Sequence, residues 1–101
     1  MITVVATIRI KPGNRDAFVV IFKAMVPSVV QEEGCIEYYP AVDFDTGWPV
    51  QQPDGDVVTI IEKWRDLEAL ERHLKTPHMR AYQEKTKDMI EGRIIKVLQN
   101  A

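Results

Sequence analysis

Residues 2–11 alternate between apolar and polar side chains, and this period of two is the feature that most restricts the fold. The even positions from 2 to 10 carry Ile, Val or Ala, and most of the odd positions carry Thr, Arg or Lys. Successive side chains of a β-strand point to opposite faces, so the pattern predicts a strand with one buried face. A chain with such a strand must build a sheet and cover one side of it.

The segment that follows predicts the first helix. Apolar residues recur at helical spacing between Asn14, which is expected to cap the helix, and Gly34, which is expected to end it. Residues 35–44 and 56–64 predict two further strands. The stretch between them, 45–55, is rich in Pro, Gly and Asp and is expected to form a long hairpin connection.

The last third of the chain predicts short helices and a final strand. Asp66 is expected to cap a helix, and Thr76 with Pro77 is expected to start another, which Gly92 ends. Residues 93–98 then return as a strand. The order of strand, helix, strand, strand, helix, strand predicts one domain over residues 1–101, an α+β ferredoxin-like antiparallel sheet with helices on one face.

Two of the predicted strands have apolar side chains on both faces. The runs VVTII and RIIKVL leave no polar face for water once helices cover one side. Strands that are apolar on both faces are usually buried on both, so the second face is expected to pack against an identical sheet in a two-fold homodimer.

Charge and cysteine content exclude several classes of partner. Thirteen basic and fifteen acidic residues give a net charge of −2, without the cationic stripe that nucleic acid or an anionic membrane requires. Cys35 is the single cysteine, so an internal disulfide is impossible and a reducing cytoplasm is expected. The first residues lack an apolar segment long enough for a signal peptide or membrane span.

The stretch HLKTPHMRAY contains both histidines, His73 and His78. On an unbroken helix, positions five apart lie about 140° apart, so the two rings are not expected to share a metal ion. His78 is expected near a helix N-terminus, which favours a neutral imidazole able to act as a base; the alternative is an incidental hydrogen-bonded histidine. For His73, a surface or boundary position is favoured.

Glu62 and Trp64 are predicted to share one strand face. A carboxylate on an apolar face is costly unless paired, which suggests a functional group; the alternative is an ion pair with Arg9 or Lys96. Trp64 is open to a purely structural role in the core. Tyr38 and its neighbour Tyr39 point to opposite faces, and Tyr38 is favoured to reach a pocket on the helix side.

The segments IRIKPGNRDAF, EEGCIEYY, IIEKWRDLEALERHL and TPHMRAY, in that order, resemble the antibiotic biosynthesis monooxygenase family over nearly the whole chain. The resemblance implies a small dimeric α/β barrel that oxygenates phenols or quinols with molecular oxygen, without metal or flavin. The segment 45–55 is longer than the family's common hairpin. We therefore expect a pocket for a small aromatic substrate, with no cofactor; its candidate catalytic residues are His78 and Glu62, and its candidate substrate-binding residues are Tyr38, Trp64, His73 and Tyr82.

Two alternatives remain at this point. A haem-degrading relative of the same fold class uses an asparagine on the first strand, where this chain has Ala6 and Thr7, so haem breakdown is disfavoured. The other alternative is a dimeric ligand-binding or stress-associated barrel that holds an aromatic compound without converting it, because one apolar pocket can serve either purpose.

Overall fold

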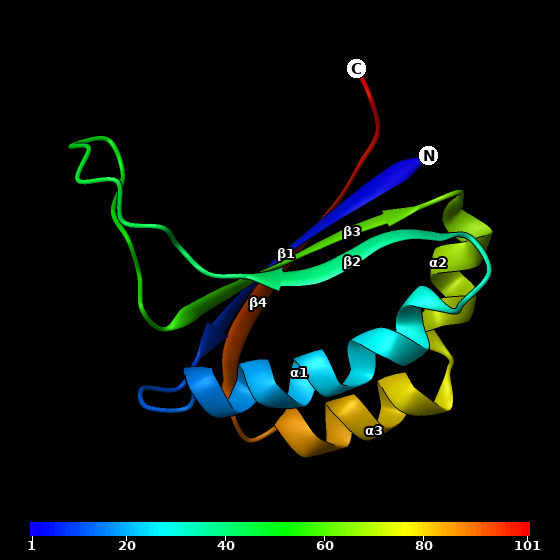
Figure 1. The fold of residues 1–101 in the computed structure, drawn as a ribbon, viewed down its shortest axis with the longest axis horizontal. Coiled ribbons are helices and arrows are strands. Elements are labelled where there is room, and N and C mark those ends of the chain that lie inside the picture. The colour runs from blue at the N-terminus through cyan, green and yellow to red at the C-terminus, as the bar shows by residue number, and fades with distance from the viewer.

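A computed structural model describes all residues, 1–101, as one antiparallel sheet with helices on one side (Figure 1). In chain order the elements are β1 (Ile2–Ile10), α1 (Arg15–Val30), β2 (Cys35–Ala41), β3 (Val57–Trp64), α2 (Leu67–Leu74), α3 (Pro77–Thr86) and β4 (Ile90–Leu98). No helix is long and apolar enough to cross a bilayer.

The four strands lie in the order β2-β3-β1-β4, and every neighbouring pair is antiparallel. This is the strand order of a ferredoxin-like fold, so the predicted fold class is confirmed. Within one chain the sheet is open, with β2 and β4 at its edges. Closure into a dimeric barrel stays a prediction.

The period of two on β1 describes its burial correctly. Val4, Ala6, Ile8 and Ile10 are buried, whereas Arg9 is exposed. Their partners in the core include Phe18 and Phe22 of α1 and Tyr82 of α3. Each fully buried large apolar side chain contributes roughly 1.5–3 kcal/mol, so the alternation supplies the main drive that holds the helices against this face.

Several predicted boundaries are corrected by the structure. β2 ends at Ala41 and not at Phe44, because the chain leaves the sheet there and projects as the long connection to β3 (Figure 1). Gly92 does not end a helix; it lies within β4, opposite Arg9 of β1. α1 ends at Val30, and Gly34 follows in the turn before β2.

The predicted helix caps differ in outcome. The side chain of Asp66 accepts the backbone N–H of Ala69 at 2.9 Å, and that of Thr76 accepts the N–H of Met79 at 3.3 Å, so both caps are confirmed. Asn14 occupies the N-cap position of α1 but makes no side-chain cap. Its amide instead donates to carbonyl groups of the preceding turn.

Candidate functional site

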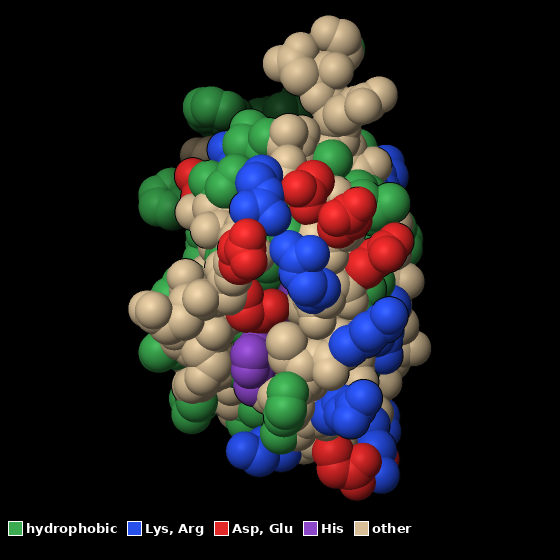
Figure 2. Space-filling model, turned by 90° about the vertical axis from the view of Figure 1, so that its right-hand side faces the viewer, with side chains coloured by type: hydrophobic (Ala, Val, Ile, Leu, Met, Phe, Trp, Pro, Cys, Tyr) green, Lys and Arg blue, Asp and Glu red, His purple; other side chains and the backbone are tan.

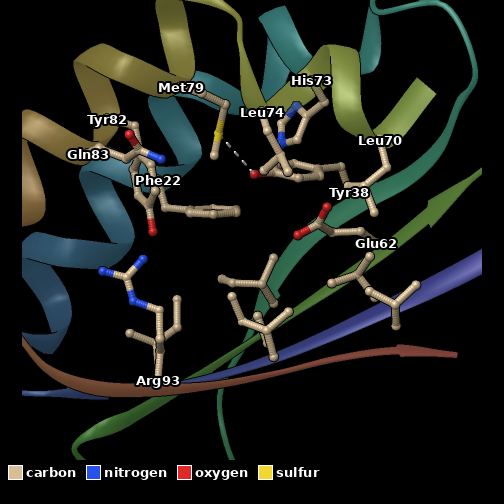
Figure 3. Close-up of a pocket in the computed structure, with 16 residues that line it drawn as sticks. Phe22, Tyr38, Glu62, Leu70, His73, Leu74, Met79, Tyr82, Gln83 and Arg93 are labelled. Carbon is tan, nitrogen blue, oxygen red and sulfur yellow. Dashed lines mark hydrogen bonds between the residues drawn. The ribbon is translucent and has the colours of Figure 1, made fainter. Parts of the chain in front are cut away.

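A cavity of about 200 Å³ lies between the inner face of the sheet and the helices (Figure 3). Sixteen residues line it, and twelve of them are hydrophobic. Its four charged or strongly polar lining residues are Glu62, His73, Gln83 and Arg93. A cavity smaller than the roughly 300–1,000 Å³ of drug-sized sites suits a small aromatic molecule.

Sheet register places two of the predicted residues side by side. Tyr38 of β2 lies directly opposite Glu62 of β3, and both line the cavity. Tyr38 is buried and stacks on Phe22, with ring centroids 5.2 Å apart, whereas Tyr39 is half exposed on the other face. The preference for Tyr38 over Tyr39 as the residue that reaches the pocket is therefore confirmed.

Glu62 is buried without a cationic partner. Its Oε1 accepts the indole N–H of Trp64 at 2.9 Å, and burial raises the pKa of Glu62 to about 7 although this hydrogen bond opposes the rise. The alternative of an ion pair is wrong: Arg9 pairs with Asp54, and Lys96 lies opposite Val5 on the outer face. The carboxyl group is thus poised to hold or release a proton near neutral pH.

Trp64 and Tyr82 occupy different places around the site. Trp64 is fully buried and does not line the cavity; it contacts the site through its hydrogen bond to Glu62 and through its ring, whose centroid lies 4.7 Å from that of His73. Tyr82 lines the cavity, and burial raises its pKa to about 12, against the opposing effect of the Arg93 cation. Both tyrosine hydroxyls stay protonated at neutral pH, because burial also raises the pKa of Tyr38.

The two histidines are placed differently from the expectation. His73 is buried, with 1% of its side chain exposed, and it lines the cavity, so the expectation of a surface or boundary position is wrong. His78 is 26% exposed and is not among the lining residues. Both rings contact one oxygen: Oε2 of Glu32 is 2.8 Å from Nδ1 of His73 and 2.8 Å from Nε2 of His78.

The break between α2 and α3 explains this arrangement. On an unbroken helix the two rings would diverge, but α2 ends at Leu74 and α3 begins at Pro77. The turn brings the ring centroids of His73 and His78 to 6.4 Å from each other. Together with Glu32 they place three possible ligand atoms within 4.8 Å of one another, so the premise that the two rings point apart is wrong.

The contact with Glu32 fixes the tautomer of His73. A carboxylate oxygen only accepts hydrogen bonds, so Nδ1 of His73 carries the hydrogen. Burial lowers the pKa of His73, and this effect outweighs the opposing effect of Glu32. The lowered pKa favours the neutral ring. Its Nε2 makes no hydrogen bond. Every fully buried side-chain nitrogen or oxygen atom in the structure has a hydrogen-bond partner, so Nε2 is not fully buried. Nε2 is therefore a free acceptor that keeps contact with the cavity.

Sequence reasoning missed Arg93 and Glu32. Arg93 lies at one end of the cavity, near Tyr82 (Figure 3), on the same strand face as Ile95 and Val97. A period-two count along β4 was sufficient to find it. Glu32 lies in the turn after α1, 41 residues from His73 and 46 from His78. No local pattern in the sequence joins these three residues.

Comparison with known proteins gives a consistent result. The family model described as "Antibiotic biosynthesis monooxygenase" matches residues 1–85. A protein of Escherichia coli K12 named "Probable quinol monooxygenase YgiN" is 43% identical, over 98% of this chain and 97% of its own. The crystal structure of PA3566 from Pseudomonas aeruginosa superposes with a TM-score of 0.83 at 29% identity, covering 99% of this chain and 93% of that one. A conserved protein of Methanosarcina mazei shares the fold, with a TM-score of 0.85 at 22% identity over 99% and 92% of the two chains.

Proposed function

The chain belongs to the antibiotic biosynthesis monooxygenase family, and on this basis we propose that it oxidises a small quinol or phenol with molecular oxygen in the cavity between sheet and helices. Membership of the family and 43% identity to a protein named as a probable quinol monooxygenase support a monooxygenase-type activity. The substrate class, the use of oxygen without metal or flavin, and the residue roles below are our proposal.

The observation that carries the proposal is the position of the His73 ring at the cavity wall, in contact with Glu32. Its Nδ1–H is held by Glu32 at 2.8 Å, so the ring orientation is fixed and Nε2 is left to accept a proton. A hydroxyl group bound near Nε2 loses its proton to this nitrogen as the reaction proceeds. A base held in place in this way typically accelerates such a step by about 10²–10⁴.

Deprotonation is the step that allows an aromatic alcohol to react with oxygen. The phenolate or quinolate is far richer in electrons than the neutral alcohol and reduces O₂ directly. For a quinol, one oxygen atom enters the ring and the other leaves as water, and the ring supplies all four electrons to give a hydroxyquinone. The substrate is its own reductant, so the protein has to supply orientation, proton transfer and exclusion of water.

Glu62 and Tyr38 form the polar wall opposite the apolar lining. Glu62 has a pKa of about 7, so its protonated form donates a hydrogen bond to a substrate oxygen and its ionised form accepts one. Glu62 of β3 and Val97 of β4 both pair with Val4 of β1, so they lie at the same height along the strands. Arg93 is four residues before Val97 on β4, which places it about 13 Å from this height along the strand direction. Its cation favours an anionic substrate or intermediate from the other end of the cavity.

His78, the histidine first favoured as the base, has a place in this proposal as a positioning residue. It shares Oε2 of Glu32 with His73 and is partly exposed. We propose that it holds Glu32 against Nδ1 of His73. A direct role as the base requires a substrate that reaches beyond the residues lining the cavity, and a comparison of His73→Ala with His78→Ala separates the two roles.

The test is oxygen consumption by the purified protein with reduced menadione, in the presence of a metal chelator. Labelling with ¹⁸O₂ separates oxygenation, which places the label in the ring, from autoxidation to the unlabelled quinone. We expect labelled hydroxyquinone to form with the protein and not in its absence. If a panel of one-ring and two-ring quinols binds but none incorporates label, the chain is a binding protein.

A further inference from the structure

We propose that Glu32, His73 and His78 form a binding site for a divalent transition-metal ion of the Zn²⁺ class, behind the wall of the cavity. The three side chains come from three separate elements: the turn after α1, the C-terminal half of α2 and the first turn of α3. Their ligand atoms all lie within 4.8 Å of one another, although Glu32 is 41 and 46 residues away from the two histidines in the sequence.

The distances suit a shared ion. Nδ1 of His73 and Nε2 of His78 each lie 2.8 Å from Oε2 of Glu32. Zinc holds nitrogen and oxygen ligands at about 2.0–2.1 Å in a tetrahedron, which sets the ligand atoms about 3.3 Å apart, so each N···O pair must open by roughly half an ångström. All three ligand atoms already lie within 4.8 Å of one another. His73 is fixed by burial. The more exposed His78 is the ring that is free to adjust.

The surroundings favour a cation and leave it a route from solvent. His73 is buried and Glu32 nearly so, whereas His78 reaches the surface. Figure 2 shows an imidazole and acidic side chains adjoining each other on the face formed by α2 and the turn after α1. With three protein ligands, a tetrahedral ion keeps one position for water, as in zinc sites that are open to solvent.

The set of donors selects the class of ion. Two imidazole nitrogens and one carboxylate oxygen suit Zn²⁺, Co²⁺ or Ni²⁺, whereas Ca²⁺ and Mg²⁺ require sites built from oxygen. A carboxylate that already accepts from two rings also orients both of them toward a common point. In the metal-free protein the same contacts serve as ordinary hydrogen bonds, which is the competing explanation that the experiment must separate.

Metal binding would change the cavity, a consequence that rests on the proposed function. An imidazole that binds metal through Nδ1 carries its hydrogen on Nε2. The cavity-facing nitrogen of His73 then donates a hydrogen bond and no longer accepts a proton. A bound ion would therefore suppress the base, so Zn²⁺ is expected to inhibit oxygenation and a chelator to restore it.

The experiment measures metal binding directly and needs no activity. Untagged full-length protein is titrated with Zn²⁺ by calorimetry and in competition with a chromogenic chelator, with Mg²⁺ as a negative control. We expect one Zn²⁺ per chain with micromolar or tighter affinity. Co²⁺ is expected to give the visible absorption of a four- or five-coordinate site.

Variants locate the ion. His78→Ala and Glu32→Gln are expected to weaken Zn²⁺ binding by on the order of 100-fold or more, because each removes a ligand. Glu33→Gln is the matched control: it neutralises the adjacent acidic residue, which pairs with Arg65 and not with a histidine. Circular dichroism checks that each variant folds, and the Co²⁺ spectrum of the unmodified protein tests the site without any substitution.

Two results overturn the proposal. One is the absence of saturable Zn²⁺ binding and of a Co²⁺ spectrum in the unmodified protein, which leaves the three residues as a hydrogen-bonded group. The other is binding that both His78→Ala and Glu32→Gln leave unchanged, which places the ion elsewhere. Neither result bears on the test of oxygenation. Conversely, a protein that is inactive toward every quinol can still bind Zn²⁺ at this site.

Discussion

The indole N–H of Trp64 donates a hydrogen bond to the carboxyl group of Glu62 at 2.9 Å, between two residues of the same strand face. Trp64 is fully buried and lies outside the cavity, whereas Glu62 lines it. A core side chain thus favours the ionised form of a cavity residue. The hydrogen bond lowers the pKa of Glu62 while burial raises it, and burial prevails.

Replacing Trp64 with Phe tests this relationship. Trp64→Phe keeps an aromatic ring but removes the donor, so the pKa of Glu62 is expected to rise above its present value of about 7. The smaller ring also costs stability, by about 1–3 kcal/mol. NMR titration of ¹³C-labelled glutamate, with the resonance assigned by its loss in Glu62→Gln, measures the pKa. A pKa that stays the same or falls contradicts the role given to the indole.

Glu62 also makes the stability of the protein depend on pH. Its carboxyl group has a pKa of about 7 when folded and an ordinary value of 4.5. Between these values the unfolded chain has lost the proton that the folded chain retains, so the free energy of unfolding falls as the pH rises from about 4.5 to 7. The shift corresponds to about 3 kcal/mol.

Glu62→Gln removes this dependence and keeps an acceptor for Trp64. As the pH rises from 4.5 to 8, the free energy of unfolding of the variant is expected to increase relative to that of the parent protein by up to about 3 kcal/mol. Urea unfolding of both proteins at the two pH values, at one protein concentration, measures the difference. A difference between the two proteins that is the same at both pH values would mean that Glu62 ionises as readily in the fold as in the unfolded chain.

Gly34 and Gly13 offer a matched pair for the turn that carries Glu32. Both have positive φ, +87° and +85°, but a Cβ on Gly34 would lie 2.5 Å from Cβ of Ala69, and one on Gly13 would meet nothing within 4 Å. The cost of the backbone conformation is common to both substitutions. Gly34→Ala is therefore expected to lower the free energy of unfolding by about 1–3 kcal/mol more than Gly13→Ala does, because of the clash with Ala69 of α2. Thermal unfolding of the two variants measures this, and equal losses would contradict the close approach.

Much of the fold follows from patterns of short range. The alternation on β1 and the two helix caps at Asp66 and Thr76 depend on residues within a few positions of each other, and these predictions are confirmed. The shared inner face of Tyr38 and Glu62 follows from the same period of two, whereas their direct opposition is set by the register of the paired strands. The sheet face of the site was therefore accessible from the sequence.

The helical side of the site was not accessible in the same way. The positions of His73 and His78 depend on the turn between α2 and α3, which is set by packing and not by helical period. Their common partner, Glu32, comes from the turn after α1 and is brought to them only by the complete fold. Without that partner, His73 had no visible reason to be buried.

The fourth strand carries the prediction of a dimer. Ile94 and Leu98 on its outer face are 65% and 45% exposed, and Ile95 and Val97 on its inner face are 57% and 51% exposed. An edge strand that is apolar on both faces is a liability unless it is covered. Light scattering after size exclusion is expected to give twice the chain mass of 11.6 kDa. Ile94→Glu is expected to shift the protein toward the single-chain mass, and a parent protein that already elutes as a monomer contradicts the dimer.

The two histidines have separable roles in the proposed reaction. His73 lines the cavity with a free Nε2, whereas His78 contacts Glu32 from outside the lining. His73→Ala is expected to lower kcat by about 10²–10⁴ with little change in KM, because the base acts only as the barrier is crossed. His78→Ala is expected to lower kcat less, because Glu32 is then held less firmly against His73 but the base itself remains. Steady-state ¹⁸O incorporation with a chelator present compares them, with Glu33→Gln as the control. Full loss in His78→Ala together with an active His73→Ala would reverse the assignment and make His78 the base.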